Sequence, residues 1–151
     1  MSADQGGKGL EPEDVAICTD VLDLMVGQAR QQAPLECCGF LTGRDGRIDQ
    51  AVPMTNAAAS PTRFEVAPQD LFNFFRQLRG SPRRLMGIYH SHPASPAVPS
   101  QLDIDEFRYP EATYWIISLA QEPPSIRCWR WVRMGFREVN YRRERSSRLG
   151  R

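Results

Sequence analysis

The chain contains only two histidines, and they lie two positions apart in the segment His90-Ser91-His92-Pro93. On a β-strand, residues i and i+2 point to the same face, about 6.6–7 Å apart along the backbone. Two imidazoles arranged in this way can bind one metal ion, because neutral ring nitrogens are common metal ligands. The motif therefore predicts a metal site at the end of a strand.

A hydroxyl and a carboxylate residue follow at short range. Ser100 comes after the seven residues 93–99, and Asp103 lies three positions further on. Two imidazoles and one carboxylate suit zinc and leave a fourth position open, as a catalytic zinc site requires. We therefore expect His90, His92 and Asp103 to bind a metal ion together. Taken singly, each histidine is equally an ordinary polar residue, and Asp103 a favourable charge at a helix start.

Glu36 is the candidate for proton transfer. A zinc ion lowers the pKa of a bound water toward about 7, and a carboxylate must still pass the proton to a leaving amine. Glu36 stands in the segment 34–39, Pro-Leu-Glu-Cys-Cys-Gly, where a loop should enter a strand. An ordinary surface glutamate explains the same local sequence.

If Glu36 faces the metal, alternation puts Cys38 on the same face and Cys37 in the core. Cys38 is then a spare ligand, a redox-sensitive thiol or simply a small buried residue.

The elements that must position these residues alternate between helix and strand. Apolar residues spaced three and four apart predict an amphipathic helix over 12–30, which Pro34 ends. A second helix should begin at Pro68 and end at Gly80, and a capping box, Ser100-x-x-Asp, should open a third. The turn 44–46, Arg-Asp-Gly, joins two strands of a hairpin. Strands are expected at 39–42, 47–55, 63–67, 84–90, 113–120, 125–132 and 136–141. The pattern predicts a mixed α/β or α+β sheet.

Length and composition indicate a single domain. The chain has 151 residues, of which 41% are hydrophobic and 25% charged, as in ordinary globular proteins. Residues 1–11 lack the hydrophobic stretch of a secretory signal and should form a disordered leader before a domain over 12–141. No apolar run is long enough for a membrane span. The four cysteines form no Cys-x-x-Cys pair and favour free thiols in a reducing cytoplasm.

The net charge of +1 conceals a basic end. Residues 137–151 contain six arginines and two glutamates, and we expect a basic tail over 142–151. Such a tail either binds nucleic acid or an acidic protein surface, or simply stays solvated. Without a nucleic-acid-binding motif, a nucleic-acid partner is not expected.

The order of the motifs resembles the JAMM (MPN+) zinc metalloprotease family. The resemblance rests on Glu36, on 87–93 (Gly-Ile-Tyr-His-Ser-His-Pro) and on 99–103 (Pro-Ser-Gln-Leu-Asp). It extends over 12–141 and includes Asn56 and the pair Arg63-Phe64. It implies a cytidine-deaminase-like (MPN) α/β fold, with a mixed central β-sheet flanked by about three helices.

The resemblance also implies roles for the site residues. One zinc ion per chain would be bound by His90, His92 and Asp103, with Glu36 as general acid and base. Ser100 either caps a helix, worth about 1 kcal/mol, or hydrogen-bonds the tetrahedral intermediate, as the matching serine does in the family. We favour the catalytic role, because zinc and Ser100 would then hold the same oxygen. Ser91 should point away from the metal.

Members of this family hydrolyse an amide or isopeptide bond after the C-terminal tail of ubiquitin or a ubiquitin-like protein. The chain lacks the long insertions of the eukaryotic members and is similar to the small stand-alone prokaryotic type. That type acts on sulfur-carrier proteins of ubiquitin-like fold, for example by releasing cysteine. The resemblance thus implies a cytoplasmic zinc metallopeptidase with such a carrier as substrate.

Other function classes remain open from the sequence. A catalytically silent MPN scaffold would lack one of the ligands, and a cell-wall or phage-tail peptidase is a further hydrolase alternative. A zinc deaminase requires His-x-Glu and Pro-Cys-x-x-Cys, which are missing. A basic-tailed nucleic-acid adaptor would bind with strong salt dependence. The oligomeric state is not determined by the sequence.

Overall fold

The computed structural model describes residues 15–133 and 135–145. Within these ranges, three helices and eight strands follow one another along the chain. The helices are α2 (Thr19–Gln32), α3 (Pro68–Arg79) and α4 (Gln101–Glu106). The strands are β1 (Val15–Cys18), β2 (Cys38–Arg44), β3 (Arg47–Met54), β4 (Arg84–His92), β5 (Thr113–Ser118), β6 (Ser125–Val132), β7 (Gly135–Val139) and β8 (Tyr141–Glu144).

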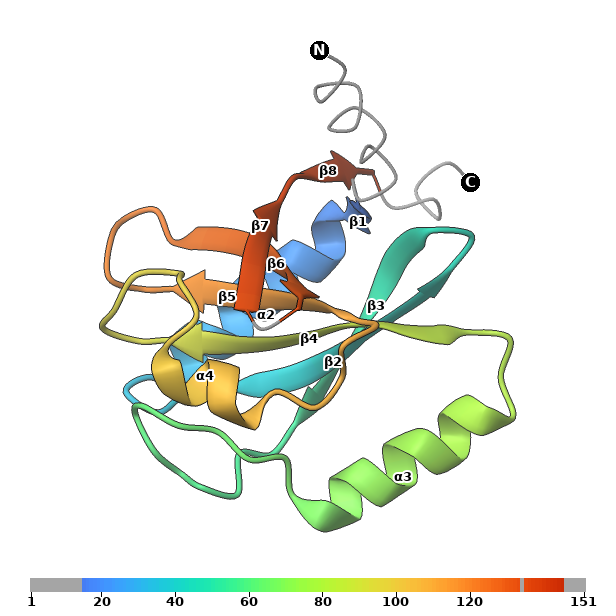
Figure 1. Ribbon diagram of the computed structural model, residues 1–151, viewed down its shortest axis with the longest axis horizontal. Coiled ribbons are helices and arrows are strands. Elements are labelled where there is room, and N and C mark those ends of the chain that lie inside the picture. Colours follow the sequence, from blue (N-terminus) through green and yellow to red (C-terminus); the bar gives the residue numbers. More distant parts are fainter. Residues whose placement is uncertain (1–14, 134, 146–151) are drawn as a thin grey trace.

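The strands form one mixed sheet in the order β7-β6-β5-β4-β2-β3-β1-β8 (Figure 1). The pairs β4–β5, β1–β3 and β1–β8 are parallel, and the other neighbours are antiparallel. The expected mixed α/β sheet with about three helices is confirmed. Among the described residues, none of the helices has the length and apolar content needed to cross a bilayer.

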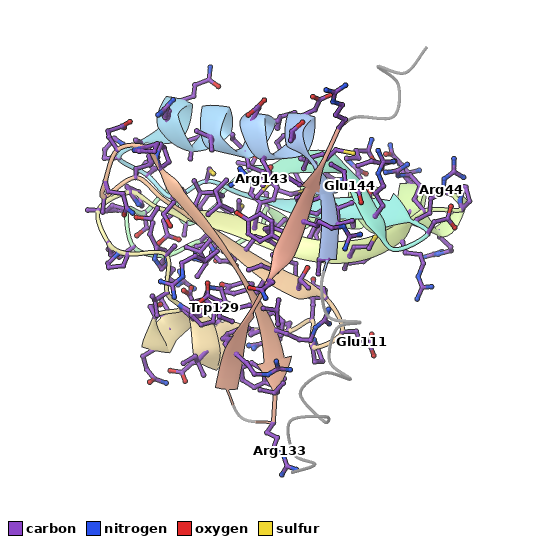
Figure 2. The ribbon with its side chains drawn as sticks, turned by 90° about the horizontal axis from the view of Figure 1, so that it is seen from above. Arg44, Glu111, Trp129, Arg133, Arg143 and Glu144 are labelled. Atoms are coloured by element: carbon purple, nitrogen blue, oxygen red, sulfur yellow. The ribbon has the colours of Figure 1, made fainter. Side chains whose placement is uncertain are left out.

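The sheet separates two layers of the core, and the central strand β4 contributes side chains to both. Residues in register across neighbouring strands share a face, and His90 lies in register with Cys38 of β2 and Ile116 of β5. Tyr89, one position earlier, belongs instead to the apolar cluster that includes residues of α2. Figure 2 shows α2 and α4 on opposite sides of the sheet. Alternation along β4 therefore sends the histidines toward α3 and α4, away from α2.

The hairpin between β2 and β3 forms where the sequence predicts it. Asp45 and Gly46 both have positive φ, 58° and 74°. Two successive residues of this kind make the turn that matches the twist of a β-hairpin, and Asp-Gly suits it. The second and third helices also lie as predicted, with Pro68 at the start of α3.

Three expectations about the elements are wrong. The helix expected over 12–30 begins only at Thr19, because residues 15–18 form the fully buried strand β1 between β3 and β8. Residues 63–67 are not a strand; they contribute one isolated bridge, Val66 to Asn56. The strand expected over 136–141 divides at Asn140: the chain passes there from β7, which pairs with β6 at one edge of the sheet, to β8, which pairs with β1 at the other edge.

The last strand also corrects the expected domain boundary. Residues 142–144, placed in a basic tail over 142–151, pair with β1 as part of β8. Arg47 of β3 donates a hydrogen bond of 2.9 Å to Glu144, which anchors this edge. The expected leader, 1–11, and the remainder of the tail from residue 146 lie outside the described residues.

Candidate metal centre and active site

The two histidines lie together at the carboxyl end of β4. Their ring centroids are 4.8 Å apart, and His90 is fully buried while His92 is 4% exposed. The ring of Phe64 stacks on His90, with centroids 4.6 Å apart and planes inclined by 23°. The i, i+2 spacing therefore brings both imidazoles to one face, as expected.

Asp103 meets the histidines from the first turn of α4. Ser100 Oγ accepts a hydrogen bond of 3.0 Å from the Asp103 amide, and Asp103 Oδ2 accepts one of 2.9 Å from the Ser100 amide. This reciprocal pair is the predicted capping box. The same carboxylate places Oδ1 3.3 Å from His90 Nε2 and Oδ2 3.2 Å from His92 Nε2. The helix cap thus fixes the carboxylate between the two rings.

The hydrogen bonding of His92 calls for a cation at this point. Its Nδ1 lies 2.7 Å from the carbonyl oxygen of Pro96. Because a carbonyl only accepts, we assign the hydrogen to Nδ1, which leaves Nε2 of the neutral ring with a lone pair. That lone pair faces the Asp103 carboxylate, and two acceptors attract only through a proton or a metal ion. A backbone carbonyl on the far nitrogen is the usual support of a metal-binding histidine.

Three other buried polar atoms also converge on this site. Both ring nitrogens of His90 and Oε1 of Glu36 have no hydrogen-bond partner among the described residues. The 3.3 Å contact between His90 Nε2 and Asp103 lacks hydrogen-bond geometry. One ligand atom each from Glu36, His90 and His92 lies within 4.8 Å of the others. Since buried polar atoms without partners cost about 1–3 kcal/mol each, the donor set fits a metal ion.

Burial and mutual charge separate the pKa values of the site. Burial raises the pKa of Glu36 to about 8, although His92 opposes the rise. Burial also raises the pKa of Asp103, but the imidazoles of His90 and His92 beside its carboxylate outweigh burial and hold that pKa well below its usual range. Burial lowers the pKa of His90, whereas the contacts of His92 with Asp103 and Pro96 raise its pKa despite burial. The site therefore pairs an anionic Asp103 with a Glu36 suited to proton transfer near neutral pH.

Glu36 lies between α2 and β2 and is 4% exposed, which excludes an ordinary surface glutamate. Its amide donates to the carbonyl of Ser60 at 2.9 Å, and its carbonyl accepts from Asn56 Nδ2 at 3.0 Å. The structure thus brings Glu36 to the histidines from a segment more than fifty residues away in sequence.

Ser91 lies between the two histidines, and the sequence predicted no role for it in the site. Its side chain points away from the histidines, as expected, and its Oγ accepts a hydrogen bond of 2.8 Å from the Cys37 amide. The Ser91 amide donates in return to the Cys37 carbonyl at 3.1 Å. Strand alternation predicts the direction of this side chain, but its partner follows only from the pairing of β4 with the segment after Glu36.

The two adjacent cysteines divide between the faces as expected. Cys37 joins the core on the α2 side, and Cys38 lies in register with His90. Burial raises the pKa of Cys37 to about 11 and that of Cys38 to about 12. Both side chains are fully buried, and these pKa values favour the protonated thiol at neutral pH.

Two hollows flank the site. A cleft of about 730 Å³ runs between α2 and the end of β3, with Glu36 in its lining together with Leu24, Gly27 and Asn56. A more apolar cavity of about 420 Å³ is lined by Asp103 and by Phe64. Asp103 therefore borders one of these spaces and Glu36 borders the other.

This fold and this group of residues define a JAB-type domain. Residues 19–132 match the family described as prokaryotic homologs of the JAB domain, and the chain belongs to that family.

Named relatives fall in the same group. The CysO-cysteine peptidase of Mycobacterium tuberculosis is 35% identical over 106 residues, which cover 69% of this chain and 73% of the relative. The desampylase of Haloferax volcanii is 32% identical over 111 residues, covering 69% of this chain and 80% of the relative. A solution structure of a Desulfitobacterium hafniense protein superposes with a TM-score of 0.78 at 30% identity, covering 87% of this chain and 93% of that one.

The Ser91 contact predicts a stability effect. Ser91→Ala leaves the buried Cys37 amide without an acceptor, so we expect a loss of about 1–3 kcal/mol in the free energy of unfolding. Ser91→Thr keeps the hydroxyl and should lose less. Urea unfolding followed by tryptophan fluorescence measures both, and equal stability of wild type and Ser91→Ala would contradict the assigned role.

Proposed function

We propose that this chain is a zinc metallopeptidase that hydrolyses an amide or isopeptide bond at the C-terminus of a ubiquitin-like, sulfur-carrier-type protein. The observation that carries the proposal is the buried convergence of His90, His92 and Asp103 beside the partnerless carboxylate oxygen of Glu36.

His90, His92 and Asp103 are the proposed zinc ligands, with one zinc ion per chain. Bonds of about 2.0–2.1 Å at tetrahedral angles place ligand atoms about 3.3–3.4 Å apart. Oδ1 of Asp103 lies 3.3 Å from His90 Nε2 and Oδ2 lies 3.2 Å from His92 Nε2, so each oxygen has this spacing to one of the two rings. Ligand atoms of Glu36, His90 and His92 also lie within 4.8 Å of one another. This limit is looser than the 3.2 and 3.3 Å contacts of Asp103, and we therefore assign Glu36 as the proton carrier rather than as a third ligand.

Each remaining group has a part in amide hydrolysis. Bound zinc supplies a Lewis acid that polarises the scissile carbonyl and activates water. Glu36 takes a proton from the water and delivers it to the leaving amine. The Ser100 oxygen accepts the cap hydrogen bond, so its hydroxyl hydrogen is available to donate to the developing oxyanion. The cap and the catalytic role of Ser100 are therefore compatible.

The cleft that ends at Glu36 suits an extended polypeptide tail. It runs between a helix and a strand end, and its wall contains the exposed side chain of Leu24 and the bare backbone of Gly27. An open, partly polar cleft of this kind can receive an extended peptide segment. The activity named for the mycobacterial relative, on CysO-cysteine, supports a carrier–cysteine bond as the first substrate to test.

We propose that the reaction takes place in the cytoplasm, in keeping with four free cysteines.

Metal content tests the ligand set. We expect one zinc ion per chain in wild type and in Glu36→Gln, and less than about a tenth of that in His92→Ala, which loses one of three ligands. Elemental analysis of purified protein gives the stoichiometry. Glu36→Gln should retain zinc and lose carrier–cysteine hydrolysis by a factor of about 10²–10⁴. A wild type that takes up no zinc on reconstitution would favour a non-catalytic scaffold.

Ser100→Gly separates capping from catalysis. Glycine is a tolerable N-cap that costs only a few tenths of a kcal/mol, but it has no hydroxyl. We expect kcat to fall by about 10²–10³ while the unfolding midpoint changes little. Ser100→Thr retains both functions and serves as the matched control. If kcat of Ser100→Gly stays within about twofold of that of Ser100→Thr, the hydroxyl has no catalytic role.

Substitutions at Gly27 test whether the C-terminal tail of the substrate binds in the cleft. A Cβ added at Gly27 meets no atom within 4 Å, so Gly27→Ala should stabilise α2 by up to about 1 kcal/mol. Gly27→Leu gains similar helix propensity but extends a side chain into the cleft. We expect its KM for a carrier–cysteine adduct to rise about tenfold, equivalent to about 1.4 kcal/mol. Equal KM values for the two variants would show that the substrate does not use this cleft.

A further inference from the structure

The side chain of Asn56 makes four hydrogen bonds in and around the loop between β3 and α3. Its Nδ2 donates to the carbonyl of Glu36 and to that of Arg63, each at 3.0 Å. Its Oδ1 accepts from the amides of Ala58 at 2.9 Å and Glu65 at 3.0 Å. A side-chain amide offers two donor hydrogens and two acceptor lone pairs, so Asn56 uses all of its hydrogen-bonding capacity here.

The four bonds connect two parts of the proposed active site. The bonds to Arg63 and Glu65 bracket Phe64, whose ring stacks on His90. The bond to the Glu36 carbonyl holds the segment that carries the proposed proton carrier. Two backbone hydrogen bonds flank the isolated bridge between Asn56 and Val66: the Ala57 amide donates to the Glu65 carbonyl at 2.7 Å, and the Ala67 amide donates to the Thr55 carbonyl at 3.1 Å. The side chain of Asn56 adds to this short pairing, and within the described residues it alone extends the connection to the Glu36 and Arg63 carbonyls.

Three polar side-chain atoms of Glu36 and His90 have no hydrogen bond of their own to orient them among the described residues. They are Oε1 of Glu36 and both ring nitrogens of His90. His92, in contrast, is held by the Pro96 carbonyl at its Nδ1. A metal-binding histidine normally gains its orientation from such a partner on the second nitrogen. For His90, ring contacts supply the restraint instead: Phe64 stacks on it at 4.6 Å, and Tyr114 lies against it at 5.1 Å between centroids.

We propose that Asn56 is a positioning residue of the active site: it holds Glu36 through that residue's carbonyl and His90 through Phe64. The role in catalysis rests on the proposed function, whereas the role in holding the Glu36–Cys37 peptide does not. The Cys37 amide of that peptide donates to Ser91 Oγ, so it reports directly on whether the peptide stays in place.

Asn56→Asp tests the proposal with little change of shape. The carboxylate can still accept from Ala58 and Glu65, but it has no hydrogen to donate, so two oxygens now face each other at the Glu36 carbonyl. We expect exchange of the Cys37 amide hydrogen, measured by NMR in zinc-loaded full-length protein, to accelerate at least about tenfold. We expect kcat on a carrier–cysteine adduct to fall about 10- to 100-fold. KM should stay within about twofold and zinc content at the wild-type value.

Thr62→Ala is the matched control. Thr62 lies in the same loop, and among the described residues its hydroxyl has one hydrogen-bond contact, with Ser60 Oγ at 3.4 Å. The neutral variant Asn56→Ala separates loss of the hydrogen bonds from the added charge of Asp, and it should also accelerate Cys37 exchange. If Asn56→Asp shows the Cys37 exchange rate and kcat of Thr62→Ala, the proposal is overturned. A wild type without zinc or activity would defeat the proposed function, and Cys37 exchange would still decide whether Asn56 holds the peptide.

Discussion

A buried carboxylate placed between two imidazole nitrogens is the constraint on which the rest of the structure depends. Asp103 is 8% exposed and lies within 3.3 Å of both Nε2 atoms. A charge taken out of water is costly unless it is paired, and a neutral imidazole that presents its lone pair offers no compensation. The arrangement is favourable when a cation sits among these atoms. The fold must therefore hold three acceptors together in advance of the ion that stabilises them.

The capping box of α4 and the side-chain alternation of β4 provide this preorganisation. The capping box that begins α4 satisfies two backbone amides, and it also sets the direction of the Asp103 carboxylate. The alternation of β4 directs His90 and His92 to one layer while Tyr89 and Ser91 face the other. Tyr89 donates to Gln28 of α2 and Ser91 accepts from Cys37, so the strand that carries the ligands is restrained from its opposite face.

Glu36 shows why part of the site is not readable from neighbouring residues. Its own segment is a short connection without regular structure, and the local sequence fits an exposed loop equally well. It becomes buried because β2 pairs with β4, and because Ser60 and Asn56 bind its backbone from a loop that follows β3. These contacts join residues 20 or more positions apart, which no period or turn signal encodes.

The sequence by itself determined the His-x-His spacing, the Ser100 cap with Asp103 and the Asp45-Gly46 hairpin. Each of these depends on the geometry of a few consecutive residues, which alternation, capping and turn preferences describe well. Only the tertiary structure decided that residues 15–18 are a strand, that the chain changes edges at Asn140 and that Phe64 stacks on His90. These features depend on partners distant in sequence: an apolar run beside a helix becomes a strand when two other strands are there to pair with it.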